Sequence, residues 1–223
     1  MKHIVQFSGG KDSTCMLLMM LERGMPVDDI IFCDTGMEFP QMYEHIDKVE
    51  QYIGRKITRL KAEHSFEHMM FDYTKIKGVS AGQKGYGWAT MLVRWCTWYF
   101  KQQVTSTYLK GQNYLSYIGI AYDEPKRHQN VSKNTVHPLF DWQITEKQAL
   151  STCYKHGFTW GGVVRRFRQS FLLVLSTKVT ERIKGFVSQI SCIMGKTERV
   201  GFKILESIPC RLQCTTTRRK VSA

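Results

Sequence analysis

Several features that would assign the chain to a membrane or secreted class are scarce or absent. Its 223 residues contain no run of about 18 apolar residues, so no membrane-spanning helix and no membrane partner are expected. The amino-terminal stretch lacks a signal-peptide pattern, because a Gly-Gly pair already stands at residues 9 and 10. The seven cysteines are odd in number and, except for Cys210 and Cys214, widely spaced. That spacing disfavours a disulfide framework and predicts a reducing, cytoplasmic location.

The last quarter of the sequence lacks residue types that the rest contains. Residues 163–223 hold no Trp, Tyr or Asp, although the whole chain has 5 Trp and 10 Tyr. The same segment carries 13 Lys and Arg against 3 Asp and Glu, and so supplies most of the net charge of +13. Such basicity would suit a nucleic-acid partner, but it belongs to the tail alone. The composition therefore predicts one domain at residues 1–162 and an irregular basic extension at residues 163–223.

The first thirteen residues combine a strand with a glycine-rich turn. Residues 2–7 are expected to form a buried strand, and the apolar positions up to residue 23 a helix. Glycines let backbone amides close on a phosphate, and a helix amino terminus adds about half a positive charge. The turn is therefore predicted to bind phosphate through Ser8, Gly9, Gly10, Lys11, Asp12 and Ser13. A polar turn in which Asp12 or Ser13 caps the helix is the alternative.

A second buried strand, residues 30–33, leads into the polar turn Asp34-Thr35-Gly36. Strand, helix and strand make a βαβ unit, whose crevice lies at the carboxyl ends of the strands. Asp34, Thr35 and Gly36 are therefore expected at the same edge of the sheet as the first turn. A capped turn without a ligand is the alternative.

Later segments continue this alternation. Helices are expected at residues 41–53 and 146–156, and strands at residues 55–60 and 117–121. Short apolar strands with little alternation are typical of parallel sheets. The pattern predicts an α/β fold with an open, mostly parallel sheet flanked by helices.

Four segments, in this order, resemble the phosphoadenosine-phosphosulfate (PAPS) reductase family of the adenine-nucleotide alpha-hydrolase (PP-loop) superfamily. The S-G-G-x-D-S turn resembles the pyrophosphate loop of the superfamily, and D-T-G-x-E-F-P at residues 34–40 is similar to the family's L-D-T-G-x-x-F-P. G-I-A-x-D-E-x-x-R at residues 119–127 resembles G-x-R-x-x-E/Q-x-x-R, and P-L-x-D-W recurs at residues 138–142. The resemblance covers residues 1–162 and implies the fold of that superfamily.

The resemblance also implies a ligand, PAPS or ATP. Asp34, Thr35 and Gly36 would border this nucleotide, and Arg127 would clamp its phosphate or phosphosulfate with two parallel hydrogen bonds. A solvated loop charge is the alternative for Arg127, and Ala121 replaces the first Arg of the family segment. The leading reaction is reductive release of sulfite from PAPS, for which a reductant protein would be the partner. Adenylation with sulfur transfer to a nucleic acid, in which Mg²⁺ could accompany ATP, and an inactive nucleotide binder are the alternatives.

Cys96 stands where relatives place an iron–sulfur cysteine, and a [4Fe–4S] cluster needs four thiolates. Relatives that carry the cluster continue with Ser-Cys-Trp-Cys-Cys-Pro-Leu, whereas residues 172–178 are Leu-Leu-Val-Leu-Ser-Thr-Lys. If those residues are encoded TTG CTG GTG TTG TCC ACT AAA, translation one base later gives Cys-Trp-Cys-Cys-Pro-Leu. A frameshift near Val163 would thus explain the tail, and no cluster is expected in this chain. A genuine basic extension is the alternative.

The carboxyl-terminal E-C-G-L-H motif of the family is also absent, and Cys214 is a poor substitute for the cysteine of that motif.

Overall fold

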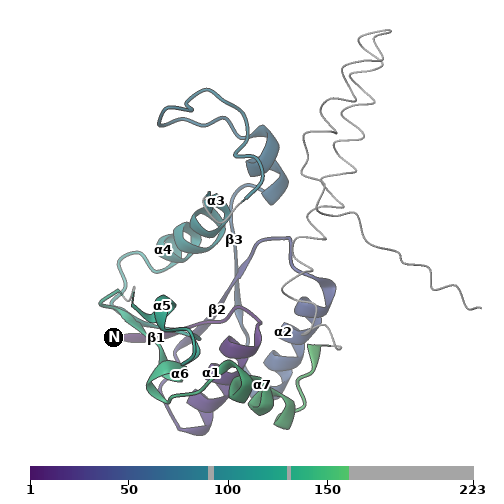
Figure 1. Cartoon of the computed structure of the whole chain (residues 1–223), viewed down its shortest axis with the longest axis vertical. Coiled ribbons are helices and arrows are strands. Elements are labelled where there is room, and N and C mark those ends of the chain that lie inside the picture. Colours follow the sequence, from purple (N-terminus) through teal and green to yellow (C-terminus); the bar gives the residue numbers. More distant parts are fainter. Residues whose placement is uncertain (90–92, 130–131, 161–223) are drawn as a thin grey trace, which may run out of the picture. The chain divides into compact units, whose positions relative to one another are not determined.

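Figure 1 shows the computed structural model, in which residues 1–89, 93–129 and 132–160 are described. The chain divides into two units, residues 1–169 and 170–223, and the described residues belong to the first. The predicted boundary at residue 162 and the predicted extension lie outside the described residues. The strands are β1 (Lys2–Gln6), β2 (Asp29–Asp34), β3 (Thr58–Lys61), β4 (Tyr114–Ile118) and β5 (Thr135–Val136).

Helices and single helical turns connect the strands. The longer helices are α1 (Lys11–Glu22), α2 (Pro40–Ile53) and α7 (Glu146–Lys155). The shorter ones are η1 (His68–Asp72), α3 (Trp95–Thr97), η2 (Trp98–Gln103), α4 (Val104–Tyr108), α5 (Pro125–His128) and α6 (Pro138–Asp141). Among the described residues, no helix is long and apolar enough to cross a membrane.

The five strands form one parallel sheet in the order β3-β2-β1-β4-β5. This arrangement confirms the predicted open α/β sheet. Val5 in the central strand pairs with Ile30 of β2 on one side and with Tyr117 of β4 on the other. The chain runs outward from β1 to β3 and then returns to the opposite side of β1. The topological switch point, where α/β folds bind their ligands, therefore lies between β1 and β4.

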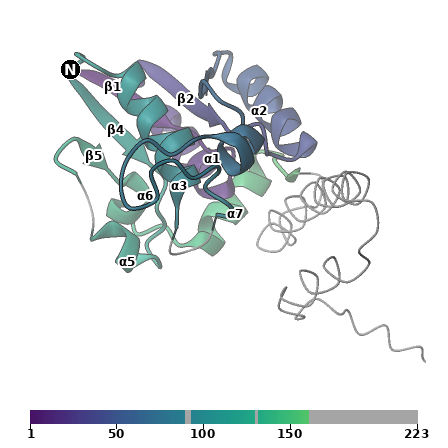
Figure 2. The same ribbon diagram turned by 90° about the horizontal axis from the view of Figure 1, so that it is seen from above.

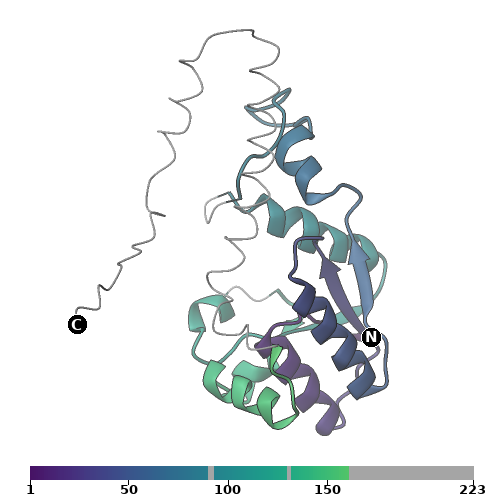
Figure 3. The same cartoon turned by 90° about the vertical axis from the view of Figure 1, so that its right-hand side faces the viewer.

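The two faces of the sheet are covered unequally. One face packs against α1, α2 and α7, and its core includes Val5, Phe32 and Tyr117. Figure 1, Figure 2 and Figure 3 agree that α7 lies beside α1. On the other face Ile4 and Ile31 form a smaller cluster with Leu109, which directly follows α4.

Two predicted strands have the wrong limits. β4 runs over Tyr114–Ile118 rather than residues 117–121, because Tyr114 already pairs with Lys2 of β1. β3 begins at Thr58 rather than at residue 55, since the turn after α2 extends further than the apolar pattern indicates. Thr145 caps α7, and its hydroxyl accepts a hydrogen bond from the backbone amide of Gln148.

Candidate functional site

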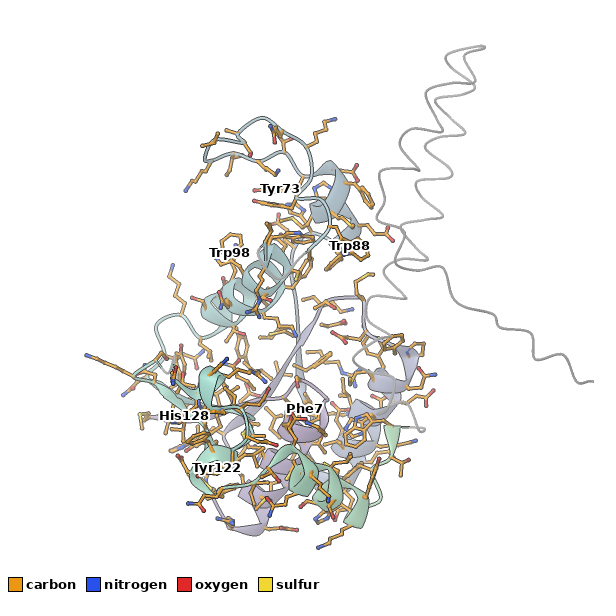
Figure 4. The ribbon with its side chains drawn as sticks, viewed as in Figure 1. Phe7, Tyr73, Trp88, Trp98, Tyr122 and His128 are labelled. Carbon is orange, nitrogen blue, oxygen red and sulfur yellow. The ribbon has the colours of Figure 1, made fainter. Side chains whose placement is uncertain are left out.

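A pocket of about 210 Å³ lies where β1, β2 and β4 end. We call it the strand-end crevice. Its lining comes from the ends of these strands, the first turn, η2 and α5: Gln6, Phe7, Ser8, Ser13, Ile31, Phe32, Cys33, Glu38, Lys101, Ile118, Gly119 and Arg127. Figure 4 shows Phe7 among the buried side chains of the domain. A larger pocket of about 400 Å³ beside β3 contains none of the predicted site residues.

The first turn presents two hydroxyl groups to the strand-end crevice. Ser8 Oγ lies 3.0 Å from Ser13 Oγ, and the Ser8 amide donates to Ser13 Oγ at 3.2 Å. Gly10 is the N-cap of α1 and makes no side-chain cap hydrogen bond, so neither Asp12 nor Ser13 caps the helix. A helix end without a side-chain cap leaves backbone donors of its first turn available for an anion.

Lys11 and Asp12 belong to the same turn, but their side chains lie outside the strand-end crevice. Lys11 Nζ is 2.9 Å from Asp12 Oδ2 and 3.1 Å from Glu146 Oε2 of α7. Burial alone would lower the pKa of Lys11, but the two carboxylates raise it above its ordinary value. Neither side chain lines the crevice. The predicted role of both residues in phosphate binding would therefore depend on their backbone amides.

The Asp34-Thr35-Gly36 turn is held by hydrogen bonds of its own. Asp34 Oδ1 accepts from the Tyr43 hydroxyl at 2.7 Å and from the Gly36 amide at 2.9 Å. Burial opposes the ionisation of Asp34, but these donors and Lys61, 3.4 Å from Oδ2, lower its pKa below the ordinary value. Asp34 is thus an ionised group that fixes the turn. Cys33 and Glu38 line the crevice, whereas the predicted residues Asp34, Thr35 and Gly36 are not part of its lining.

Two cations line the strand-end crevice. The sequence predicted Arg127, whose Nη1 lies 2.6 Å from Glu124 Oε2. His128 stacks on Phe140 with ring centroids 3.7 Å apart, which holds the short helix α5 that carries Arg127. Sequence reasoning missed Lys101 of η2, because no local signal shows that η2 packs against the end of β2.

The crevice also contains a thiol and a carboxyl group. Cys33 Sγ lies 3.3 Å from Thr105 Oγ1, and burial raises the pKa of this thiol. Burial likewise raises the pKa of Glu38, against the opposing charge of Lys101 and the hydrogen bond from Thr35. The Asp-Thr-Gly motif predicted the turn at residues 34–36 but not the Cys33 and Glu38 side chains on either side of it.

Gly119 closes the crevice beside the first turn. A Cβ added at this position would lie 2.8 Å from the carbonyl carbon of Asp12 and 2.8 Å from the amide nitrogen of Ser13. The end of β4 therefore lies directly against the first turn of α1, in an approach that only a glycine permits. Ala121, which replaces the family's first Arg, is fully buried.

The described cysteines do not suit an iron–sulfur cluster. Within residues 1–89, 93–129 and 132–160, no group of three or more His, Cys, Asp or Glu could hold a metal ion. Cys96 has a free, half-buried thiol in α3. Cys192, Cys210 and Cys214 lie outside the described residues.

The buried rings of His45 and Trp160 pack together and hold the first turn through hydrogen bonds. His45 Nε2 lies 3.0 Å from Thr14 Oγ1, and the His45 ring is 4.5 Å from that of Trp160. The Trp160 indole donates to the carbonyl oxygen of Gly9 at 2.9 Å. Burial, together with the charge of Lys48, lowers the pKa of His45 from 6.5 to about 4. His45 is therefore neutral at pH 7.

The pKa of His45 predicts acid sensitivity. Between pH 6.5 and pH 4 the unfolded chain binds a proton at this residue and the folded chain does not. The free energy of unfolding is therefore unaffected by His45 above pH 6.5 and falls as the pH drops to 4, by about 3 kcal/mol in all. Urea unfolding at several pH values measures it. His45→Gln should remove this part of the slope, and an unchanged slope would contradict the assignment.

Comparison with known proteins identifies relatives of the described domain. A family model described as "Phosphoadenosine phosphosulfate reductase domain" matches residues 2–150. An uncharacterized protein of Methanocaldococcus jannaschii is 29% identical over 177 residues, covering 70% of this chain and 34% of that protein. An uncharacterized nin region protein of Escherichia phage lambda is 27% identical over 146 residues, covering 57% and 50%. The chain thus spans at most half the length of these curated relatives.

Two solved structures are also similar. One is the PAPS reductase of Candida auris in its phosphate complex, 19% identical, covering 71% of this chain and 74% of that chain with a TM-score of 0.48. The other is the U34-tRNA thiolase NcsA of Methanococcus maripaludis with its [4Fe-4S] cluster, 14% identical, covering 99% and 78% with a TM-score of 0.45. The family model spans most of the chain, including the first turn, the Asp-Thr-Gly turn and Arg127, and the chain belongs to the phosphoadenosine phosphosulfate reductase domain family.

Proposed function

We propose that this chain is an enzyme that binds an adenylyl nucleotide, PAPS or ATP, in the strand-end crevice and uses it in sulfur-related chemistry. The observation that carries the proposal is the meeting of four anion-binding features in one pocket. They are the helix end without a side-chain cap, the paired hydroxyls of Ser8 and Ser13, and the cations of Lys101 and Arg127. The pocket also lies at the topological switch point, where α/β folds bind nucleotides.

Each group has a physical role in this proposal. Ser8, Ser13 and the amides of the first turn donate hydrogen bonds to phosphate oxygens, while Arg127 and Lys101 neutralise the charge of the leaving or transferred anion. Magnesium usually binds through one or two carboxylates together with substrate phosphates. Glu38 is the carboxyl group that lines the described crevice, so it would hold the ion if ATP is the substrate.

The reaction that we favour is reductive release of sulfite from PAPS. Two electrons from a reductant protein cleave the bond between sulfur and the phosphate oxygen, which leaves sulfite and adenosine 3′,5′-bisphosphate. Sulfur transfer to a nucleic acid would instead consume ATP, releasing pyrophosphate on adenylation and AMP when sulfur displaces the adenylyl group. Isothermal titration with ATP, PAPS and adenosine 3′,5′-bisphosphate distinguishes them. Tight binding of the bisphosphate without conversion of ATP supports the reductase, whereas ATP turnover to AMP would contradict it.

Cys33 provides a direct probe of where the nucleotide binds. Its thiol is half-buried in the crevice, whereas the Cys96 thiol is not part of the crevice lining. We expect saturating adenosine 3′,5′-bisphosphate to slow alkylation of Cys33 by N-ethylmaleimide at least tenfold, because a bound ligand covers the thiol. Mass spectrometry of the peptides measures the rate, with Cys96 as the internal control. Equal protection of both cysteines, or of neither, would contradict binding in the crevice.

A further inference from the structure

The first turn is attached to a residue far away in the sequence. Trp160 is 5% exposed, and its Nε1 donates to the carbonyl oxygen of Gly9 at 2.9 Å. Gly9 has a φ of +75°, and a side chain there would collide with Met42 of α2. Gly9 therefore lies against α2, and its carbonyl group is held by a buried indole.

The hydrogen bond from Trp160 to the Gly9 carbonyl also fixes the direction of the Gly10 N–H, because of the geometry of a peptide bond. In a trans peptide the carbonyl oxygen and the next amide hydrogen point to opposite sides, and the described residues include no cis peptide. Because the Gly9 carbonyl points to Trp160, the Gly10 amide must point away from it. The Gly10 amide indeed donates a long hydrogen bond of 3.4 Å to Ser8 Oγ, and Ser8 lines the strand-end crevice.

The indole is itself held in place. The His45 ring packs on it at 4.5 Å, and the Phe158 ring packs edge-on against His45 at 5.4 Å. The hydrogen bond between His45 and Thr14 ties this group to α1, the helix that the turn precedes. Trp160 adopts a φ of +49°, a conformation uncommon for residues other than glycine. The backbone thus accepts a less favourable conformation where the indole reaches the turn.

We propose that Trp160 is a positioning residue for nucleotide binding. Its indole N–H fixes the orientation of the Gly9–Gly10 peptide, so that the Gly10 amide donates to a phosphate oxygen in the crevice. The inference rests on the proposed function, because it assumes that an adenine nucleotide is bound there. Without the indole donor the peptide is free to rotate, and the amide is lost as a fixed donor.

The test replaces Trp160 with Phe in the full chain, which keeps a ring against His45 and removes the N–H donor together with the volume of the five-membered ring. Isothermal titration with adenosine 3′,5′-bisphosphate and with ATP should show affinity about 2- to 13-fold weaker, the fold-change that one neutral hydrogen bond contributes. Trp142→Phe is the matched control, because Trp142 packs under Arg23 at 4.0 Å and does not line the crevice. It should leave affinity unchanged even where it lowers the unfolding temperature.

A second variant keeps the inference testable if Trp160→Phe does not fold. His45→Gln removes the ring that supports the indole and retains a polar group near Thr14, and we expect it also to weaken nucleotide binding. Equal affinity of the unmodified chain and a folded Trp160→Phe or His45→Gln variant would overturn the positioning role alone. No binding of either nucleotide by the unmodified chain would overturn the proposed function and this inference with it.

Discussion

Replacing Gly119 with alanine is expected to weaken nucleotide binding by on the order of 100-fold. The added methyl group would lie 2.8 Å from two backbone atoms of α1, one in Asp12 and one in Ser13. Backbone atoms cannot rotate aside as a flexible side chain can, so the end of β4 and the first turn of α1 must separate. Separation moves Ser13 relative to Arg127, which lines the same crevice. Titration with adenosine 3′,5′-bisphosphate measures the loss.

A matched glycine separates this effect from a general loss of stability. Gly157 follows α7 with a φ of +81°, and an added Cβ would meet nothing within 4 Å. Gly157→Ala should therefore cost about 1 kcal/mol of folding free energy and leave nucleotide affinity unchanged. If Gly119→Ala binds the nucleotide as tightly as Gly157→Ala does, the contact between β4 and the first turn is not needed for binding.

The segment from β1 through the first turn into α1 could be predicted from the sequence because its signals are local. A buried apolar run, two glycines and an amphipathic stretch follow one another within 23 residues. The parallel direction of the strands could also be predicted, since a strand-helix-strand unit has few stable topologies. Local patterns were less informative for strand limits, because pairing with a neighbour extended β4 back to Tyr114.

The crevice lining depended on contacts between distant segments, and the sequence does not display these. Lys101 reaches the crevice because η2 packs beside β2, where the Lys101 carbonyl oxygen lies 3.9 Å from Cys33 Sγ. The direction of a side chain is equally non-local. Lys11 stands inside the phosphate motif, yet its ammonium pairs with Glu146 of α7. A motif thus located the turn without showing which of its side chains face the ligand.

A correction of the reading frame in residues 163–223 is expected to give the chain the ability to bind iron. We propose that residues 163–223 are translated out of frame, since they lack Asp, Trp and Tyr and carry most of the net charge. Moving the reading frame by one base near codon 163 should then restore the Cys-Trp-Cys-Cys segment. The corrected chain, reconstituted anaerobically with iron and sulfide, should bind about four iron atoms per chain. The unmodified chain should bind essentially none.

Cys96 provides the control for that experiment, because four thiolates hold such a cluster and the restored segment supplies three. Cys96→Ser in the corrected chain should sharply reduce the bound iron, whereas Cys15→Ser should not, since Cys15 is fully buried in the core beside α7. The DNA sequence gives an independent check. Codons 172–177 that do not encode cysteines one base later would exclude a frameshift, and the basic segment would then be a genuine extension of the domain.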